Sequence, residues 1–148
     1  MTVRPAVVLF RDDAVLLMQY RYGDTDVYAL PGGNPDPGED LEATLHRELL
    51  EELGVEIRVS KLLFCGVVVA RASRKEDVLH CIFLGEIVGG DPELNPLHTT
   101  AQSLVWKPVG ELVHLAMYPS VAIAIQEHSA ATLPANTYLG HIDQPYFG

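Results

Sequence analysis

Acidic residues crowd one short segment of this chain. Between positions 36 and 56 Arg47 is the only Arg or Lys, and eight residues are acidic: Asp36, Glu39, Asp40, Glu42, Glu48, Glu51, Glu52 and Glu56. On a helix, Glu48, Glu51 and Glu52 fall within about 100° of one another. Like charges at these spacings destabilise a helix by roughly 0.2–0.5 kcal/mol per pair, so a compensating positive charge is expected.

Three carboxylates from one helical turn have the chemistry of a divalent cation site. Mg²⁺ and Mn²⁺ prefer oxygen ligands, and Mg²⁺ usually combines a few carboxylates with waters and substrate phosphates. The pattern therefore indicates phosphate chemistry. The alternative is the acidic flank of a solvated amphipathic helix. The apolar stripe of that helix would comprise Leu41, Leu45, Leu49 and Leu53.

A loop dense in glycine and proline leads into this helix. Residues 30–39 read Leu-Pro-Gly-Gly-Asn-Pro-Asp-Pro-Gly-Glu. Glycine permits close backbone approach and proline fixes φ, so the loop could bring Glu39 back toward Arg47. We expect the helix to begin near Asp40 as its N-cap and to end at Gly54 in a left-handed conformation.

The segment from Gly33 to Val55 resembles the signature of the Nudix hydrolase family. That signature is a Gly, five residues, a Glu, seven residues, Arg-Glu, an aliphatic residue, any residue, Glu-Glu, any residue, a Gly and an aliphatic residue. The positions that match it are Gly33, Glu39, Arg47, Glu48, Leu49, Glu51, Glu52, Gly54 and Val55. Residues 28–32 and 105–108 also resemble family strands. A signature with this many fixed spacings is far more specific than a lone glycine-rich loop.

The resemblance implies an α/β fold, a Nudix-type α/β/α sandwich with a mixed sheet, in a single domain over residues 1–148 with the box at 33–55. One position departs from the family. Many members carry another metal-binding glutamate shortly before the late tryptophan, but residues 98–103 here read His-Thr-Thr-Ala-Gln-Ser. Gln102 could contact a metal through its carbonyl or a water, but it cannot supply the charge.

The resemblance also implies roles for individual residues. The implied metal ligands for Mg²⁺ or Mn²⁺ are Glu48, Glu51 and Glu52. The implied catalytic residues are Glu48, Arg47 and Glu39: Glu48 binds metal or serves as the general base, and Arg47 orients the glutamates by pairing with Glu39. The backbone at Gly32 and Gly33 would shape the metal and phosphate site.

The expected function is that of a Nudix pyrophosphohydrolase. It would cleave, with Mg²⁺, the phosphoanhydride bond of a nucleoside diphosphate linked to another group, such as a nucleoside triphosphate or a nucleotide sugar. The first alternative is a catalytically silent nucleotide-sensing domain, which the intact glutamates argue against. The second is an RNA-end pyrophosphohydrolase. A formal net charge of −10 disfavours it, because binding phosphate backbones needs clustered Lys and Arg.

Composition agrees with one enzyme domain. The chain has 148 residues, of which 48% are hydrophobic, enough for a substantial core. Cys65 and Cys81 lie in apolar runs, so we expect core thiols rather than a disulfide or zinc site. The start of the chain lacks the pattern of a signal peptide, and no apolar run approaches about 18 residues, so a cytoplasmic protein without membrane contact is expected. A homodimer is possible.

Other candidates lie outside the box. Arg71, Arg74 and Lys75 form the densest basic cluster and could hold terminal phosphates or a ribose-linked group, or could be a solvated turn. Arg4, Arg21 and Tyr22 could line a substrate pocket or simply pack. The aromatic tail from Asn136 to Gly148 could cover the site or dock on a neighbouring subunit. Four histidines show no metal-ligand spacing and receive no role: His46, His80, His98 and His114.

Periodicity predicts the remaining elements. Strands are expected at Ala6–Phe10, Ala14–Tyr20, Val27–Leu30, Glu56–Val59, Leu62–Ala70, Val78–Val88 and Leu104–Lys107, with a turn at Ala72–Asp77. Two helices are expected after them, Val109–Ala116 and Ser120–Ala130, with Ser120 as the N-cap of the second. Mixed strands and helices in this order favour an α/β sandwich.

Overall fold

The computed structural model describes residues 1–71, 74–130 and 136–147. Its elements are β1 (Thr2–Arg11), β2 (Ala14–Tyr22), β3 (Thr25–Ala29), α1 (Leu41–Leu53), β4 (Glu56–Val68), β5 (Val78–Gly89), β6 (Ser103–Pro108), the 3₁₀ helix η1 (Val109–His114), α2 (Ala122–Ala130) and β7 (Tyr138–His141). In this part of the chain neither α1 nor α2 has the length and apolar character of a membrane-spanning helix.

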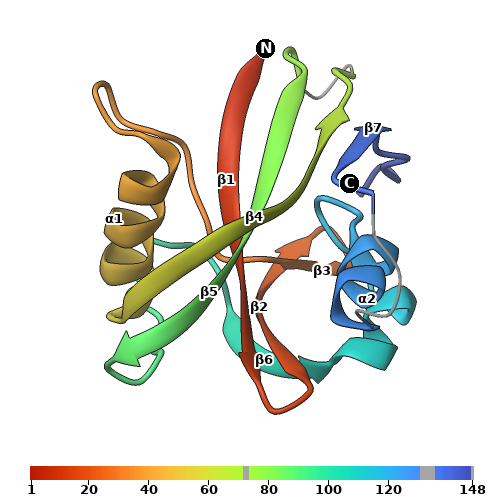
Figure 1. The fold of residues 1–148 in the computed structure, drawn as a ribbon. Helices are drawn as coiled ribbons and strands as arrows, with labels where there is room; N and C mark the ends of the chain where they lie inside the picture. Colours follow the sequence, from red (N-terminus) through yellow and green to blue (C-terminus); the bar gives the residue numbers. More distant parts are fainter. Residues whose placement is uncertain (72–73, 131–135, 148) are drawn as a thin grey trace.

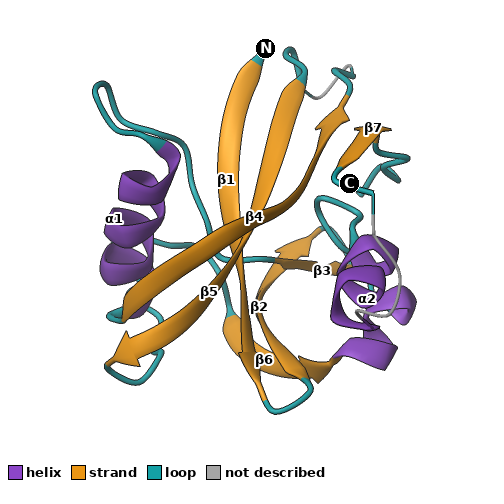
Figure 2. Cartoon of the chain, in the orientation of Figure 1, coloured by secondary structure: helices purple, strands orange, loops and turns teal. Residues whose placement is uncertain are grey.

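Seven strands form one mixed sheet with a helix on each face. The strand order is β3-β2-β1-β5-β4-β7, and β6 pairs with β2. β1 runs parallel to β5, and β4 runs parallel to β7, whereas the other pairs are antiparallel. α1 and α2 lie on opposite sides of the strands (Figure 1; Figure 2). The expected α/β sandwich with a mixed sheet is confirmed.

The two helices are held by alternate residues of the same strands. Val7 and Leu9 of β1 pack with Leu45, Leu49 and Leu53 of α1 in one cluster of buried side chains. The intervening β1 residues, Ala6 and Val8, belong to a second cluster that includes Ala124 and Ile125 of α2. Successive side chains of a strand point to opposite faces, so one apolar run serves both cores.

Helix α1 begins and ends where its sequence predicts. The Asp40 side chain accepts a hydrogen bond from the Ala43 N–H at 2.7 Å, which makes Asp40 the N-cap. Gly54 follows the last helical residue with φ of 66°, and its N–H donates back into the helix. Both ends are therefore fixed, and the glutamates keep one rotational setting relative to the sheet.

Three expected elements differ in the structure. Glu56–Val68 is one strand rather than two, because register shifts relative to β5 absorb the polar stretch around Ser60. The expected helix Val109–Ala116 is a 3₁₀ helix that ends at His114. α2 begins at Ala122, so Ser120 is not its N-cap. The expected turn Ala72–Asp77 includes residues 72 and 73, which lie outside the described residues.

The sheet opens between its two central strands. β1 and β2 pair only beside their hairpin, at Phe10 with Val15 and at Arg11 with Ala14. Farther along, the loop before α1 takes the place of β2: the Val7 N–H donates to the Pro31 carbonyl at 2.9 Å. Gly32 bridges Ala6, and a Cβ there would overlap the Pro5 carbonyl oxygen. This separation of β1 from β2 leaves room for a cleft.

Both cysteines are free thiols, as expected. Cys65 of β4 lies opposite Cys81 of β5 in the strand register, with Cys81 buried and Cys65 half-buried. Burial raises the pKa of the Cys81 thiol, which keeps that thiol protonated at neutral pH.

Candidate active site

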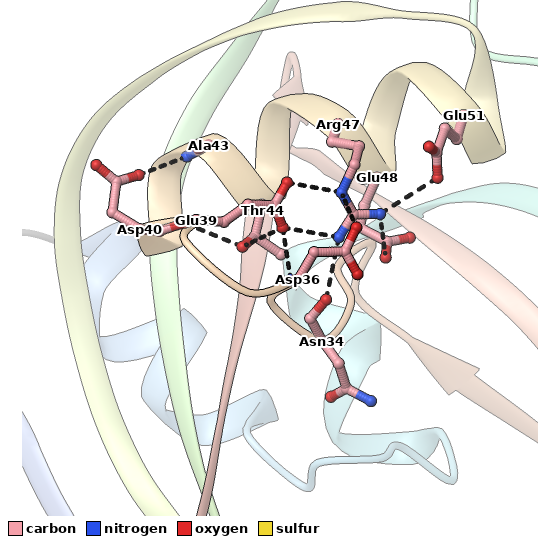
Figure 3. Close-up of polar contacts among 9 residues, drawn as sticks. All are labelled: Asn34, Asp36, Glu39, Asp40, Ala43, Thr44, Arg47, Glu48 and Glu51. Atoms are coloured by element: carbon pink, nitrogen blue, oxygen red, sulfur yellow. Dashed lines mark hydrogen bonds and ion pairs between the residues drawn. The ribbon is translucent and has the colours of Figure 1, made fainter.

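Arg47 joins the loop to the helix through a two-pronged contact. Its Nε donates to Glu39 Oε2 at 2.7 Å, and its Nη2 donates to Glu39 Oε1 at 2.9 Å (Figure 3). The same Nη2 donates to the Asn34 carbonyl at 3.1 Å. A planar guanidinium matches a carboxylate in this bidentate way, and the match fixes direction as well as distance. The loop residues 34–39 are therefore held over the middle of α1.

The remaining nitrogen of Arg47 serves the helix carboxylates. Nη1 donates to Glu48 Oε1 at 3.0 Å and to Glu51 Oε2 at 3.2 Å. Figure 3 shows both carboxylates, three residues apart on α1, turned toward the guanidinium. Arg47 supplies part of the compensating positive charge that the acidic segment requires. The side chains of Arg47 and Glu48 are 24% and 15% exposed, so solvent screens this contact only in part.

Glu39 is an ionised anchor of the loop. Besides Arg47, it accepts from the Asp36 N–H at 2.7 Å and from Thr44 Oγ1 at 3.2 Å. The hydrogen bonds from Arg47, followed by the one from Asp36, lower the pKa of Glu39 to about 2. All of these donors hold the charged form, so Glu39 positions Arg47 and does not exchange protons near neutral pH.

The environment of Glu52 favours its neutral form, whereas that of Glu39 favours the charged form. Burial, with the nearby Glu48 and Glu51 carboxylates, raises the pKa of Glu52 to about 8, and Arg4 counteracts part of this effect. Across the described residues, no three acidic, His or Cys side chains converge as a metal-binding group, and Arg47 pairs with Glu48 and Glu51. The donor set nevertheless fits a hard divalent cation. Three carboxylates lie close together on one helical turn, and the environment of one of them, Glu52, favours its protonated form unless a cation is bound.

Gly33 leaves space for the Glu48 side chain. A Cβ at position 33 would overlap the Glu48 carboxylate. The Gly33 N–H also donates to the Pro5 carbonyl at 3.3 Å, which holds the loop against β1. The expected role of the backbone at Gly32 and Gly33 thus has a steric basis, since a side chain at either position would displace a neighbour.

A cleft of about 520 Å³ adjoins this cluster where β1 and β2 separate. Its polar and aromatic lining includes Arg4, Tyr20, Tyr22, Arg74, His80 and Tyr118. Gly32 and Asn34 line it too, and Arg4 Nη1 donates to Asn34 Oδ1 at 3.2 Å. The positive charge of Arg4 also opposes part of the rise in the pKa of Glu52, so Arg4 links the cleft with that carboxylate. The cleft therefore extends from the loop that Arg47 holds, at Gly32 and Asn34, toward the start of β5.

The candidates outside the box divide into two groups. Arg74 and Lys75 line the cleft, as do Arg4 and Tyr22, whereas Arg71 lines an adjoining cavity of about 240 Å³ with Arg74. Of the two alternatives for Arg21, the structure favours the one away from the cleft. In the described part of the chain Arg21 is absent from the cleft lining and pairs instead with Asp26 at 3.0 Å.

Gln102 is held by β2. Its N–H donates to the Gln19 carbonyl at 2.7 Å, and its Oε1 accepts from Gln19 Nε2 at 3.4 Å. Its carboxamide is thus engaged with a neighbouring amide at the position where the family glutamate would stand.

The aromatic tail lies against its own chain. Gln144 is buried, accepts from the Ser120 N–H at 2.6 Å and donates to the Met117 carbonyl at 3.0 Å. This anchor brings Tyr146 and Phe147 to the adjoining cavity. That cavity shares Tyr22, Arg74 and Tyr118 with the cleft, so the tail forms part of the outer rim.

Sequence reasoning missed His80, Asn34 and Tyr118. His80 lies beside Arg4 in the parallel register of β1 and β5. Such a pairing between positions far apart in the chain leaves no local pattern. Asn34 carried a signal, because it lies inside the loop of the box, yet its contacts with Arg4 and Arg47 depend on the folded loop.

Comparison with known proteins identifies the class. A family model described as NUDIX domain matches residues 1–127. The chain therefore belongs to the Nudix hydrolase family, as its residues 33–55 indicated.

Each individual relative shares only a minority of its residues with this chain. The putative 8-oxo-dGTP diphosphatase of Bacillus subtilis is 32% identical over 72% of this chain and 65% of that protein. The NAD-capped RNA hydrolase NudC of Photobacterium profundum is 24% identical over 95% of this chain, which spans only 51% of that protein. Among solved structures, a NUDIX hydrolase from Nitrosomonas europaea has a TM-score of 0.72 and 27% identity, covering 90% of this chain and 92% of that one.

Proposed function

We propose that this protein hydrolyses a phosphoanhydride bond in a nucleoside diphosphate linked to another group, with Mg²⁺ or Mn²⁺ as cofactor. The observation that carries the proposal is the Arg47 network. One guanidinium holds Glu39 of the loop at 2.7 and 2.9 Å and Glu48 and Glu51 of the helix at 3.0 and 3.2 Å, beside a cleft of nucleotide size.

The chain's own residues would divide the work. Glu48, Glu51 and Glu52 would hold the cation, which when bound would screen the diphosphate and lower the pKa of an attacking water. Arg47 keeps Glu48 and Glu51 on one side of the helix, and Glu39 keeps Arg47 in place. Glu48 is a ligand or the general base. The lack of side chains at Gly32 and Gly33 would let the loop backbone lie close to the phosphates.

A nucleoside triphosphate is the preferred substrate class, with a nucleotide sugar as the second choice. A volume of about 520 Å³ lies within the range of small-molecule sites. The names of two relatives point the same way: the putative 8-oxo-dGTP diphosphatase and the nucleoside triphosphatase NudI of Escherichia coli, the latter 27% identical over 72% of this chain. NudC supports an RNA-end substrate, but the net charge of −10 opposes one. A single domain over residues 1–148, a cytoplasmic location and a homodimer stay predictions.

The test is hydrolysis of a panel of nucleotides with Mg²⁺ or Mn²⁺, following release of phosphate and pyrophosphate. We expect metal-dependent turnover that Glu52→Gln lowers by several orders of magnitude. Glu42→Gln is the matched control, because Glu42 is an exposed acid in the first turn of the same helix. A panel without metal-dependent hydrolysis would instead support the nucleotide-sensing alternative, and equal turnover in Glu52→Gln and wild type would remove Glu52 from the metal site.

A further inference from the structure

The cleft contains polar groups that lack partners. In the described part of the chain, three buried side-chain nitrogens have no hydrogen bond: Nη1 of Arg74 and both ring nitrogens of His80. Buried polar atoms are normally paired, and an exception calls for an explanation such as a ligand. Both residues line the same cleft, so a single occupant could satisfy them together.

Tyr118 holds these two side chains in a fixed arrangement. The His80 ring meets the Tyr118 ring edge-on, with centroids 5.4 Å apart and planes at 83°. The Arg74 guanidinium lies over the same tyrosine, 4.4 Å from its centroid. His80 is 1% exposed and sits opposite Arg4 in the strand register. Both residues line the cleft, which is where a partner for their nitrogens would lie.

His80 is neutral at physiological pH. Burial, with Arg4 and Arg74 adding to it, lowers the pKa of His80 to about 4. A neutral imidazole offers one N–H donor and one acceptor nitrogen, and Arg74 offers a further donor that carries charge. The charged donor of Arg74 requires an acceptor, and an oxygen with two lone pairs can accept from Arg74 and from the His80 N–H together.

We propose that Arg74 and His80 determine base specificity by binding a carbonyl oxygen on the nucleobase, so that the enzyme prefers bases carrying an oxo group over bases carrying an amino group at the same position. The inference rests on the proposed function. A base is favoured over a further phosphate because the aromatic rings of Tyr22 and Tyr118 line the cleft together with Arg74 and His80, although the cations Arg4 and Lys75 line it too. An amino group at this position would point its hydrogens at Arg74.

Two pairs of substrates isolate this chemistry. Uridine and cytidine triphosphates differ by an oxo or an amino group at one ring carbon, as do inosine and adenosine triphosphates. Wild-type kcat/KM should favour the oxo member of each pair by about tenfold or more, the worth of one well-placed hydrogen bond. His80→Phe and Arg74→Gln should each bring both ratios toward one, mainly by slowing the oxo substrate.

His128→Phe is the matched control. His128 is a half-buried histidine on α2 whose ring packs on Phe64, 5.2 Å between centroids, and it does not belong to the cleft lining. It should leave both ratios unchanged. Thermal melts accompany every variant, and if His80→Phe fails to fold, Arg74→Gln decides the test alone. Equal use of oxo and amino substrates by the wild type would overturn the proposal.

Further outcomes separate the two proposals. Equal losses on all four triphosphates in the variants would mean that the pair binds a phosphate, and the base proposal would fail while the hydrolase proposal stands. If neither a triphosphate nor any other nucleotide of the panel is hydrolysed, the hydrolase proposal fails, and calorimetric titration with inosine and adenosine monophosphates still tests the base preference. Stronger binding of the inosine nucleotide, abolished by Arg74→Gln, supports it; equal binding overturns it.

Discussion

Arg47 has a task that charge alone does not perform. It contacts carboxylates from two directions, Glu39 on the loop and Glu48 and Glu51 on the helix. A lysine has a single ammonium group and lacks the planar fork that meets both Glu39 oxygens at once. The geometry of the site therefore depends on the shape of this one side chain.

Arg47→Lys should reduce turnover about tenfold or more while leaving a folded protein, because small misplacements of catalytic groups have effects of that size. Glu39→Gln removes the other half of the contact, and the double variant should lose little beyond the larger single loss. The measurement is kcat for the three variants. Arg58→Lys, at an exposed arginine paired with Glu86, is the control and should keep full turnover. Strictly additive losses would show that Arg47 and Glu39 act independently.

The part of the site carried by the helix could be predicted from the residues, and the cleft could not. Glu48, Glu51 and Glu52 share one turn, and helical geometry fixes their relative directions. Arg4 and His80 lie 76 positions apart (80 − 4) and become neighbours only through the parallel pairing of β1 with β5. No local pattern contains that pairing, so His80 received no role from its surroundings in the chain.

At the scale of elements, the loop before α1 replaces a strand. Pro31 and Gly33 hydrogen-bond to β1 at the point where β2 has turned away. The two glycines of this loop face different neighbours. Gly32 faces backbone atoms of Pro5 and Ala6, whereas Gly33 faces the end of the Glu48 side chain.

Gly32→Ala and Gly33→Ala should therefore fail in different ways. The backbone atoms of Pro5 and Ala6 cannot easily move away from an added methyl group, so Gly32→Ala should lower the free energy of unfolding by about 1–3 kcal/mol. The Glu48 side chain can rotate, so Gly33→Ala should melt almost normally but lose about tenfold or more in turnover. Urea unfolding and kcat distinguish the two. Gly110→Ala, where no atom lies within 4 Å of the added Cβ, should change neither quantity. Loss of stability in Gly33→Ala with full activity would contradict this account.

Helix α1 and most strands could be predicted because their caps and periodicity are local. The sequence predicted two strands where β4 is one, because the polar residues around Ser60 interrupt the apolar alternation. In the structure the strand continues through them by means of a bulge against β5, which the local sequence does not show. Ser120 has the residue type of an N-cap, yet α2 begins two residues later, and the Ser120 N–H donates to the buried Gln144 of the distant tail, a contact that no local pattern reveals.

At the scale of the molecule, a net charge of −10 means that any cation stabilises the folded protein by screening repulsion. Divalent cations should stabilise it further by binding at the glutamate cluster. Mg²⁺ or Mn²⁺ at about 100 times its dissociation constant should add roughly 2.7 kcal/mol to the free energy of unfolding. Thermal melts across millimolar metal check this. Glu51→Gln should lose most of the shift and Glu42→Gln should keep it. A shift of equal size in both variants would mean that the stabilisation is not specific to the cluster.

Stability should also depend on pH through His80. Its pKa is lowered from 6.5 to about 4 in the folded state, so the unfolded chain takes up a proton first as pH falls. The stability linked to neutral His80 is complete above pH 6.5 and is lost progressively toward pH 4. Between pH 7.5 and pH 5 the loss should be about 2 kcal/mol.

Urea unfolding of wild type and His80→Phe at the two pH values isolates this contribution. Glu52, with its raised pKa of about 8, changes stability in the opposite direction, but it does so in both proteins. The advantage of wild type over the variant should therefore shrink by about 2 kcal/mol on going to pH 5. A difference that does not change with pH would contradict a buried neutral His80.

The register shifts of β4 have a consequence for how the chain behaves at high concentration. An outer strand with free backbone groups invites another polypeptide to extend the sheet, which is a common start of aggregation. In the described part of the chain, β7 pairs with β4 only at Cys65 and Val67. The remaining edge, Glu56–Leu62, combines exposed charges at Arg58 and Lys61 with a bulge between Val59 and Lys61. Charge and irregular backbone both oppose edge-to-edge docking, so any homodimer should form through another surface.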